Sequence, residues 1–294
     1  MAELTRPLIA RHGMGRADAY NAALLDGAQD HLLYLLAEAG VFDDGSLTFK
    51  GGTSLRKCRL GNDGRFSTDL DVAAPDDDVV LAVCEMIDGN EIGGFQYRLE
   101  PSRGDGRHWD MKISHPTLGS PAIGASVESA RRPIALQPEL LGFVPLPIHR
   151  HYGFMLPSVP VVAEAEACAE KLARYRRTSL GRDLYDLQEF ANRSIDEALV
   201  RRIWVLKVWG DVVDDHRGDK PLDPLDTLRP RRERDFHPDS LRVLTRPVDI
   251  PGWEARVRTR FQFIANLDAD EGRWVACDPR HRNEVEAALA ALAT

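Results

Sequence analysis

Residues 49–73 read FKGGTSLRKCRLGNDGRFSTDLDVA, and this stretch combines two features that seldom occur together. It starts with two glycines and two hydroxyl side chains at positions 51–54, and it ends with Asp-Leu-Asp at positions 69–71. Glycines let the backbone approach phosphate oxygens, and free N–H groups at the start of a helix bind anions. The stretch therefore suggests a site that holds a triphosphate and a metal ion together, against the simpler interpretation of a turn followed by an edge strand.

The two aspartates of this stretch lie two positions apart in DLDVA (69–73), which we predict to be a β-strand. Because side chains alternate along a strand, Asp69 and Asp71 point to one face while Leu70 and Val72 point to the core. Neighbouring carboxylates repel each other unless they are protonated or bridged by a cation. Magnesium is the usual bridge, and it usually binds together with the phosphates of a nucleotide.

The same alternation places two further residues as candidates. In AIGASVES (122–129), Glu128 falls on the polar face, so it joins the aspartates if this strand is their neighbour. In WDMKISH (109–115), Lys112 lies on the polar face, where it could contact a phosphate or simply pair with an acid.

The order of the predicted elements indicates an α+β fold. Strands dominate the first 130 residues and helices the last 130, which predicts an N-terminal lobe with a mixed β-sheet flanked by helices, followed by a mostly helical C-terminal lobe. We place the two lobes at residues 1–160 and 161–294. The predicted strands are 46–50, 69–73, 95–100, 109–115 and 122–129, and the predicted helices are 18–39, 53–60, 78–87, 162–177, 183–191, 194–210, 252–266 and 282–293.

Two local features complete this expectation. The stretch 130–160 is rich in proline and glycine, and we expect it to be a connector on the surface. Ser194 and Glu197 have the spacing of a capping box at the start of the helix 194–210.

Composition limits the class of protein. The chain has 294 residues, a net charge of −8 and 43% hydrophobic residues, as expected of a soluble globular protein. The sequence contains no run of 18 apolar residues that would predict a membrane span. The N-terminus has no apolar region of signal-peptide length, so we expect a cytoplasmic protein. The four cysteines form no CxxC pair, so we expect them to be reduced and to bind no metal.

A resemblance sharpens these expectations. FKGGTSL followed by RFSTDLD resembles the AbiEii family of nucleotidyltransferase toxins, within the DNA-polymerase-β-like nucleotidyltransferase superfamily, and the chain is similar to the MenT branch of mycobacterial toxins. The later motif of that family, Lys-Leu, a basic gap and then Asp-x-x-Asp, is matched by Lys171-Leu172 and by Asp183 and Asp186. The matching segments run from about residue 49 to residue 187.

The resemblance implies roles for these residues. Asp69 and Asp71 would bind Mg²⁺ or Mn²⁺, Lys171 would bind the triphosphate, and Asp186 would support the site or act as a base. Glu128 is a candidate third metal ligand. The residues expected to bind the NTP are Gly51, Gly52, Thr53, Ser54, Arg65, Ser67 and Lys112.

The resemblance also implies a biological role. Members of the family are the toxin halves of bacterial toxin–antitoxin pairs, and members of the MenT branch add nucleotides to the 3′ acceptor end of tRNA, which blocks aminoacylation and translation. We therefore expect tRNA and a cognate antitoxin as partners, and we expect a monomer. The antitoxin could bind the toxin, modify it or repress its transcription.

An acidic chain needs a local basic surface to bind RNA. RPRRERD (229–235), together with Arg256, Arg258 and Arg260, could form such a groove. The alternative is a solvated surface whose arginines pair with Asp235 and Glu254.

Two other functions stay open at this point. One is nucleotide transfer to a protein or small-molecule hydroxyl by the same residues. The other is a regulatory partner with no catalytic activity.

Overall fold

The computed structural model describes residues 4–293 except 44, 103–105, 131–132, 222, 238–239, 241–243 and 245. The chain divides into two compact units. The N-terminal unit comprises residues 1–133, 138–161 and 243–246, and the C-terminal unit comprises residues 134–137, 162–242 and 247–294.

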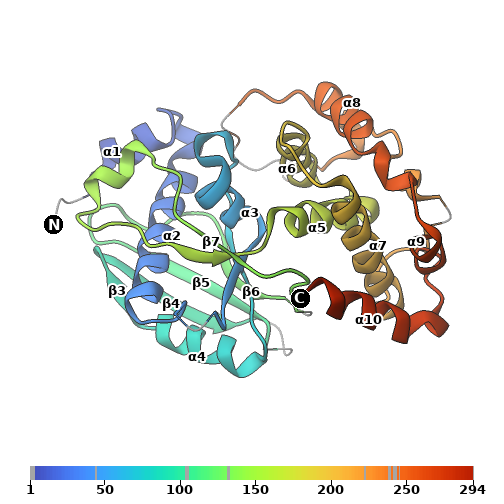
Figure 1. The fold of residues 1–294 in the computed structure, drawn as a ribbon. Coiled ribbons are helices and arrows are strands. Elements are labelled where there is room, and N and C mark those ends of the chain that lie inside the picture. Colours follow the sequence, from blue (N-terminus) through green and yellow to red (C-terminus); the bar gives the residue numbers. More distant parts are fainter. Residues whose placement is uncertain are drawn as a thin grey trace. The chain divides into compact units, whose positions relative to one another are not determined.

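The N-terminal unit is built on one eight-stranded mixed sheet with the strand order β3-β4-β5-β6-β2-β1-β8-β7 (Figure 1). Its strands are β1 (Thr48–Lys50), β2 (Asp69–Ala73), β3 (Glu91–Ile92), β4 (Phe95–Pro101), β5 (His108–Ser114), β6 (Ala125–Ser129), β7 (Glu139–Leu141) and β8 (Val159–Val161). Its α-helices are α1 (Arg6–His12), α2 (Tyr20–Glu38), α3 (Gly51–Ser54) and α4 (Asp77–Ile87). The α+β fold predicted from the sequence is confirmed.

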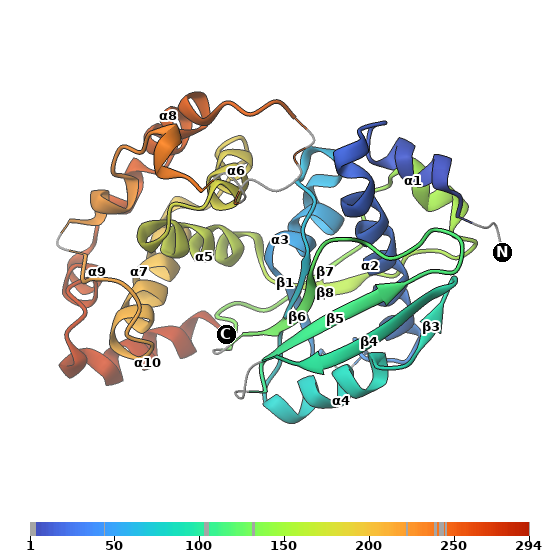
Figure 2. The ribbon, with the colours of Figure 1, turned by 180° about the vertical axis from the view of Figure 1, so that it is seen from behind.

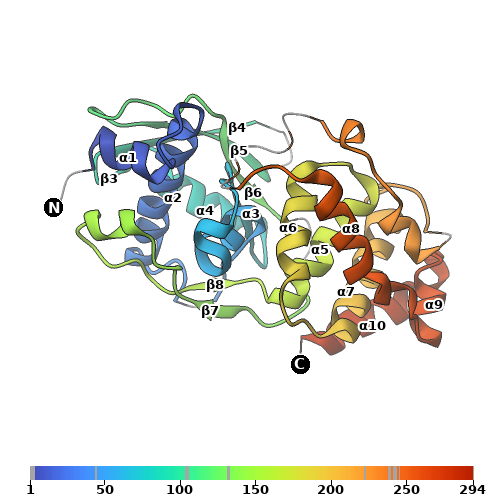
Figure 3. The same ribbon diagram turned by 90° about the horizontal axis from the view of Figure 1, so that it is seen from above.

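One face of this sheet is apolar and covered, and the other is polar. The inward residues of β2, β4, β5 and β6 are buried with α2 and α4 in one core, whose members include Leu70, Val72, Tyr97, Met111 and Val127. Figure 2 looks onto the other face, with α2 behind the strands. Figure 3 shows the β4–β5 end and the β7–β8 end on either side of α2 and α3, so the sheet curves around these helices.

The helix that follows β1 is continuous from α3 into a π-helical segment, η2 (Leu55–Leu60), as predicted for residues 53–60 but beginning two residues earlier. Gly51 adopts a φ of +76°, which favours glycine, and this lets the chain turn directly from the strand into the helix.

The prediction for residues 130–160 is wrong. Within this stretch, β7 and β8 pair with each other in antiparallel fashion, and β8 pairs in parallel with β1, so the stretch extends the sheet. Between them lies the 3₁₀ helix η4 (Pro147–His151). The prolines concealed the strands, because proline is tolerated near a sheet edge, where β7 and β8 lie.

The C-terminal unit is helical. Its helices are α5 (Glu164–Arg177), α6 (Gly181–Ala191), α7 (Glu197–Val213), α8 (Ile250–Arg260), α9 (Ala269–Trp274) and α10 (Arg282–Leu292). α5 packs against α6 and α7, and α6 packs against α8. Trp204 and Trp209 of α7 are fully buried in its core.

The predicted capping box of α7 is wrong. Asp196 caps the helix, and its side chain accepts a hydrogen bond from the N–H of Leu199 at 3.0 Å. The cap therefore lies two residues after Ser194, because an aspartate close to the first turn competes well for the free amides.

Two composition-based expectations can be compared with the structure. In the described part of the chain, no helix is both long and apolar enough to cross a membrane. The four cysteines, Cys58, Cys84, Cys168 and Cys277, are free thiols and are buried. Burial raises the pKa of Cys58 and of Cys84 to about 12, so these thiols are poor metal ligands and poor nucleophiles.

Candidate active site

The two aspartates lie on the polar face of the sheet, as predicted. On β2, Asp69 and Asp71 are partly exposed while Leu70 and Val72 are buried. The neighbouring strand is β6, in parallel register, and Glu128 lies directly opposite Asp71. The third predicted acid therefore shares the face of the other two.

The diglycine turn lies directly against these residues. A Cβ added to Gly51 would lie 1.8 Å from Oδ2 of Asp71, and one added to Gly52 would lie 2.3 Å from Nη2 of Arg65 and 2.9 Å from Oγ of Ser67. Real Cβ contacts are essentially never this short, so a Cβ at either position would force the neighbouring side chains to move. The structure thus brings Gly51, Gly52, Arg65, Ser67 and Asp71 into one cluster.

The two hydroxyls of the turn anchor it to the protein. Thr53 donates a hydrogen bond to the carbonyl oxygen of Asp69 at 2.5 Å, and Ser54 donates one to the carbonyl oxygen of Gly51 at 3.0 Å. Both side chains are fully buried. The first-turn N–H groups of this helix have no partner within the helix by geometry, so the backbone, rather than the hydroxyls, is suited to a phosphate.

Hydroxyls and an imidazole surround the carboxylates. Oδ1 of Asp69 accepts hydrogen bonds from Thr68 at 2.9 Å and from Ser126 at 3.2 Å. The Ser126 hydroxyl also lies 3.4 Å from Oε1 of Glu128, and Nδ1 of His108 lies 3.1 Å from the same oxygen. Ser126 therefore links Asp69 to Glu128, and His108 holds Glu128 from the other side.

The donor set fits a hard divalent cation that is shared with a ligand. Across the described residues, no group of three or more His, Cys, Asp or Glu side chains converges on one point as a metal cluster would. Mg²⁺ does not require such a cluster, because it usually binds through one or two carboxylates, several waters and the phosphates of a substrate. Asp69 and Asp71, beside a turn suited to phosphate, match that pattern.

Beneath the turn lies a buried ionic cluster that the sequence analysis did not predict. Lys57 contacts Asp26 at 2.7 Å and Asp30 at 2.8 Å, and Nε of Arg56 contacts Asp26 at 3.0 Å. All four side chains are less than 5% exposed, and their charges cancel. The cluster ties the helix after the diglycine turn to α2.

The cations of this cluster determine the ionisation of its acids. Burial alone would raise the pKa of Asp26, but Arg56, Lys57 and His12 outweigh it and hold the pKa well below its usual value. The pKa of Asp30 is also lowered, because Lys57 and a hydrogen bond from His149 outweigh its burial. Both carboxylates are therefore ionised inside the protein at neutral pH.

The sequence contained a signal for this cluster. Asp26 and Asp30 are four residues apart in a predicted apolar helix, so they share one face of it. Two acids on a buried face of a helix need buried cations as partners, and Arg56-Lys57 is a basic pair within the stretch 49–73.

The remaining predicted catalytic residues belong to the C-terminal unit. Nζ of Lys171 on α5 lies 2.7 Å from Asp186 and 3.4 Å from Asp183, both on α6. Asp183 also binds Nε of Arg174 at 3.1 Å and is fully buried. The motif Lys171…Asp183-x-x-Asp186 is thus one ion-pair network within this unit.

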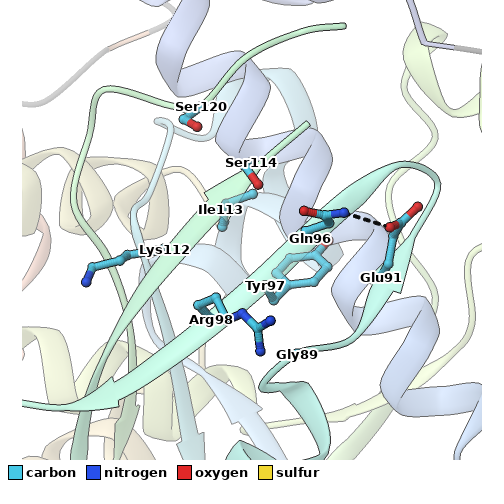
Figure 4. Close-up of a pocket in the computed structure, with 9 residues that line it drawn as sticks. All are labelled: Gly89, Glu91, Gln96, Tyr97, Arg98, Lys112, Ile113, Ser114 and Ser120. Carbon is cyan, nitrogen blue, oxygen red and sulfur yellow. Dashed lines mark hydrogen bonds between the residues drawn. The ribbon is translucent and has the colours of Figure 1, made fainter. Parts of the chain in front are cut away.

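Lys112 lies on another part of the sheet than the residues at the diglycine turn. Its side chain is exposed and pairs with Glu100 at 2.8 Å. It lines a pocket of about 270 Å³ on the β4–β5 part of the sheet, together with Arg98, Gln96 and Ser114 (Figure 4). It lies on the face that carries Asp69, but two strands away.

Many arginines of the predicted RNA groove have partners inside the C-terminal unit. Arg231 is buried and stacks on Tyr175 with its Cζ 3.8 Å from the ring centroid. Arg256 donates a hydrogen bond to Gln188. Arg258 lies 3.5 Å from Glu254, one of the two acids expected to pair with these arginines if they form a solvated surface. These arginines therefore stabilise the unit itself.

The chain matches known proteins over nearly its whole length. The sequence model of a family described as "Nucleotidyl transferase AbiEii toxin, Type IV TA system" matches residues 34–287. Among solved structures, MenT4, a nucleotidyltransferase toxin from Mycobacterium tuberculosis H37Rv, is 68% identical, covering 99% of this chain and 100% of its own, with a TM-score of 0.96.

JHP933 from Helicobacter pylori is 14% identical over 90% of this chain and 97% of its own, with a TM-score of 0.46. The comparison with curated proteins found no match.

Proposed function

We propose that this chain, which belongs to the AbiEii family of nucleotidyltransferase toxins of type IV toxin–antitoxin systems, transfers a nucleoside monophosphate from an NTP to the 3′-hydroxyl at the acceptor end of tRNA. The observation that carries the proposal is the cluster at the diglycine turn. It combines the two carboxylates on the polar face of β2 with the start of a helix, the guanidinium of Arg65 and the hydroxyl of Ser67. The family membership supplies the reaction class and implies a cognate antitoxin.

Each part of the cluster has a task in this reaction. The backbone N–H groups at the start of α3 would hold phosphate oxygens, and Arg65 and Ser67 would hold them from the side of Gly52. Asp69 and Asp71, with Glu128 opposite, would hold Mg²⁺ or Mn²⁺. When bound, the metal would neutralise charge on the α-phosphate and lower the pKa of the attacking hydroxyl.

The transfer is balanced without any further reactant. The 3′-hydroxyl gives its proton to solvent water and its oxygen forms a bond to the α-phosphorus. The bond from the α-phosphorus to the oxygen that bridges to the β-phosphate breaks, and that oxygen leaves with the pyrophosphate. We propose that Lys171 neutralises the triphosphate and that Asp186, paired with it at 2.7 Å, positions the lysine. Because tRNA and NTPs occur together in the bacterial cytoplasm, we expect the protein to act there and to arrest translation.

The test is nucleotide labelling of RNA. Purified protein is incubated with each of the four labelled NTPs and total bacterial tRNA, and in parallel with lysate protein freed of RNA. We expect label on tRNA from the wild type and none from Asp69→Ala, whose folding is checked by thermal melting. Label on protein alone, or equal labelling of tRNA by Asp69→Ala, would overturn the proposal.

A further inference from the structure

The polar face of the sheet continues past the candidate active site to the pocket on β4 and β5. Asp69 lies opposite Ser126 of β6, and Ser126 lies opposite Asp110 of β5, so these residues form one row across the sheet. Lys112 follows Asp110 by two positions on the same face of β5, and Arg98 of β4 lies opposite Lys112. The next row along the strands is therefore cationic.

The geometry of a sheet sets the distance between the two rows. With strands about 4.8 Å apart and about 3.3 Å per residue, Lys112 lies roughly 12 Å from Asp69 at the Cα atoms, and Arg98 lies roughly 16 Å away. A stacked nucleic-acid strand advances about 3.4 Å per nucleotide, so this distance corresponds to about four nucleotides.

The pocket around this row is rich in hydrogen-bond donors. Its lining includes the side chains of Arg98, Lys112, Gln96, Ser114 and Ser120, which come from β4, β5 and the segment after β5 (Figure 4). Glu91 is the acid in the lining, and its carboxylate already accepts a hydrogen bond from Gln96 at 2.9 Å. A ligand that enters this pocket therefore meets donors, which suits phosphate oxygens.

Both cations are available to a ligand. Arg98 is exposed, has no acidic partner in the described part of the chain, and extends over Gly89, where Nη1 would lie 2.8 Å from an added Cβ. Lys112 is held by Glu100, but both side chains are more than 60% exposed, and such surface pairs contribute little free energy. In Figure 4 the two side chains diverge, as successive phosphates along a strand would require.

We propose that the Arg98–Lys112 row binds the backbone of the acceptor RNA strand a few nucleotides before the 3′-end that reacts at Asp69 and Asp71. This deepens the proposed function and rests on it. The row lies wholly within the N-terminal unit, and it assigns Lys112 to the RNA strand rather than to the NTP. The acidic chain would bind RNA through this local field, since the polyanion responds to nearby charges more than to the net charge.

The experiment measures binding of labelled, unfractionated bacterial tRNA to the full-length protein carrying Asp69→Asn, which prevents turnover. Arg98→Glu should weaken binding roughly tenfold and reduce the slope of log K against log salt by about one. Glu100→Gln should tighten binding several-fold, because it releases Lys112. The matched control is Arg11→Glu, an equal charge change at an exposed arginine of α1, which should leave binding within twofold of the parent.

Affinity for a fluorescent NTP is measured in parallel, and it should be the same in Arg98→Glu and in the parent. If Arg98→Glu binds tRNA as tightly as Arg11→Glu, or if Glu100→Gln weakens binding, the inference is overturned.

The two proposals can fail separately. If wild type labels no tRNA but Arg98→Glu still reduces tRNA binding selectively, the row is an RNA site and the proposed reaction is wrong. If wild type labels tRNA and Arg98→Glu labels it with an unchanged KM for tRNA, the reaction stands and the row does not bind the acceptor.

Discussion

The carboxylate of Asp71 lies directly against the backbone of Gly51, so that a Cβ on Gly51 would come 1.8 Å from Oδ2. This contact joins the two halves of the stretch 49–73, the diglycine turn and the aspartate strand. Strand β2, which carries Asp69 and Asp71, and the diglycine turn therefore cannot be changed independently of each other. A substitution at the glycine has to displace the carboxylate.

The first prediction concerns this contact. Gly51→Ala should abolish nucleotide transfer and weaken Mn²⁺ binding, because the methyl group displaces Asp71. The backbone strain at a φ of +76° will also lower the free energy of unfolding, by about 1 to 2 kcal/mol. Mn²⁺ binding is measured by electron paramagnetic resonance and stability by urea unfolding.

Gly15→Ala is the matched control for that strain. Gly15 has a φ of +70°, and a Cβ there would have nothing within 4 Å. Gly15→Ala should lose similar stability and keep transfer activity and Mn²⁺ affinity. Equal Mn²⁺ affinity in the two variants would show that Asp71 can move away without functional loss.

The second prediction concerns His108, which holds Glu128 at 3.1 Å. Residues that orient metal-binding carboxylates commonly change metal affinity by ten- to a hundredfold when they are removed, and we expect His108→Ala to weaken Mn²⁺ binding by about tenfold. His108→Asn should restore part of the affinity, because its amide can still donate to the carboxylate. His151→Ala serves as the control histidine, and a loss of affinity there as large as in His108→Ala would contradict a specific role.

The third prediction separates the charge of Lys171 from its structural role. Lys171→Met removes the cation that pairs with Asp183 and Asp186 and that we propose to neutralise the triphosphate. A hydrogen bond to a charged group contributes about 1.5 to 3 kcal/mol, so we expect the affinity for NTP to fall by tenfold or more. Equilibrium binding of a fluorescent NTP measures this. Lys220→Met, at an exposed lysine of the same unit, should have no effect. Lys171→Arg keeps the charge and tests geometry, and NTP affinity in Lys171→Met equal to that of Lys220→Met would refute the assignment.

The parts of the site that could be predicted from sequence are those set by local periodicity. Alternation along DLDVA places Asp69 and Asp71 together, and the strand has the bounds predicted for it. Glu128 required one more condition, that β6 lies beside β2, although β6 begins 52 positions after β2 ends. The alternation of side chains predicts the face on which Glu128 lies, but only the pairing of distant strands determines that β6 is the neighbour of β2.

What could not be predicted depends on partners that are distant in sequence. Lys57 appears in the sequence as part of a basic stretch beside the diglycine turn, yet it is buried against Asp26 and Asp30 of α2. β7 and β8 were missed because prolines weaken the local strand signal while sheet pairing overrides it. In both cases tertiary contacts outweigh the local preference.

The last prediction concerns the buried ionic cluster and its dependence on pH. The pKa of Asp26 is lowered in the folded protein, so the unfolded chain binds more protons wherever the pH lies between the lowered pKa and the ordinary value of about 3.9. The stabilisation is thus fully present above about pH 4 to 5 and is lost as the pH falls through the lowered pKa. Asp26→Asn should reduce stability at pH 7 by about 3 kcal/mol, because Arg56 and Lys57 lose a buried partner.

The slope of stability against pH tests the same cluster. Between pH 5 and pH 3, the free energy of unfolding of Asp26→Asn should fall less steeply than that of wild type, whereas the exposed Asp78→Asn should follow the wild-type slope. Asp30→Asn should behave as Asp26→Asn does, because the pKa of Asp30 is lowered too, so it replaces that variant if Asp26→Asn fails to fold. Urea unfolding at each pH gives the slopes. Identical slopes in wild type and in both cluster variants would mean that these carboxylates do not have lowered pKa values, and that the cations around them do not stabilise the helix below the diglycine turn.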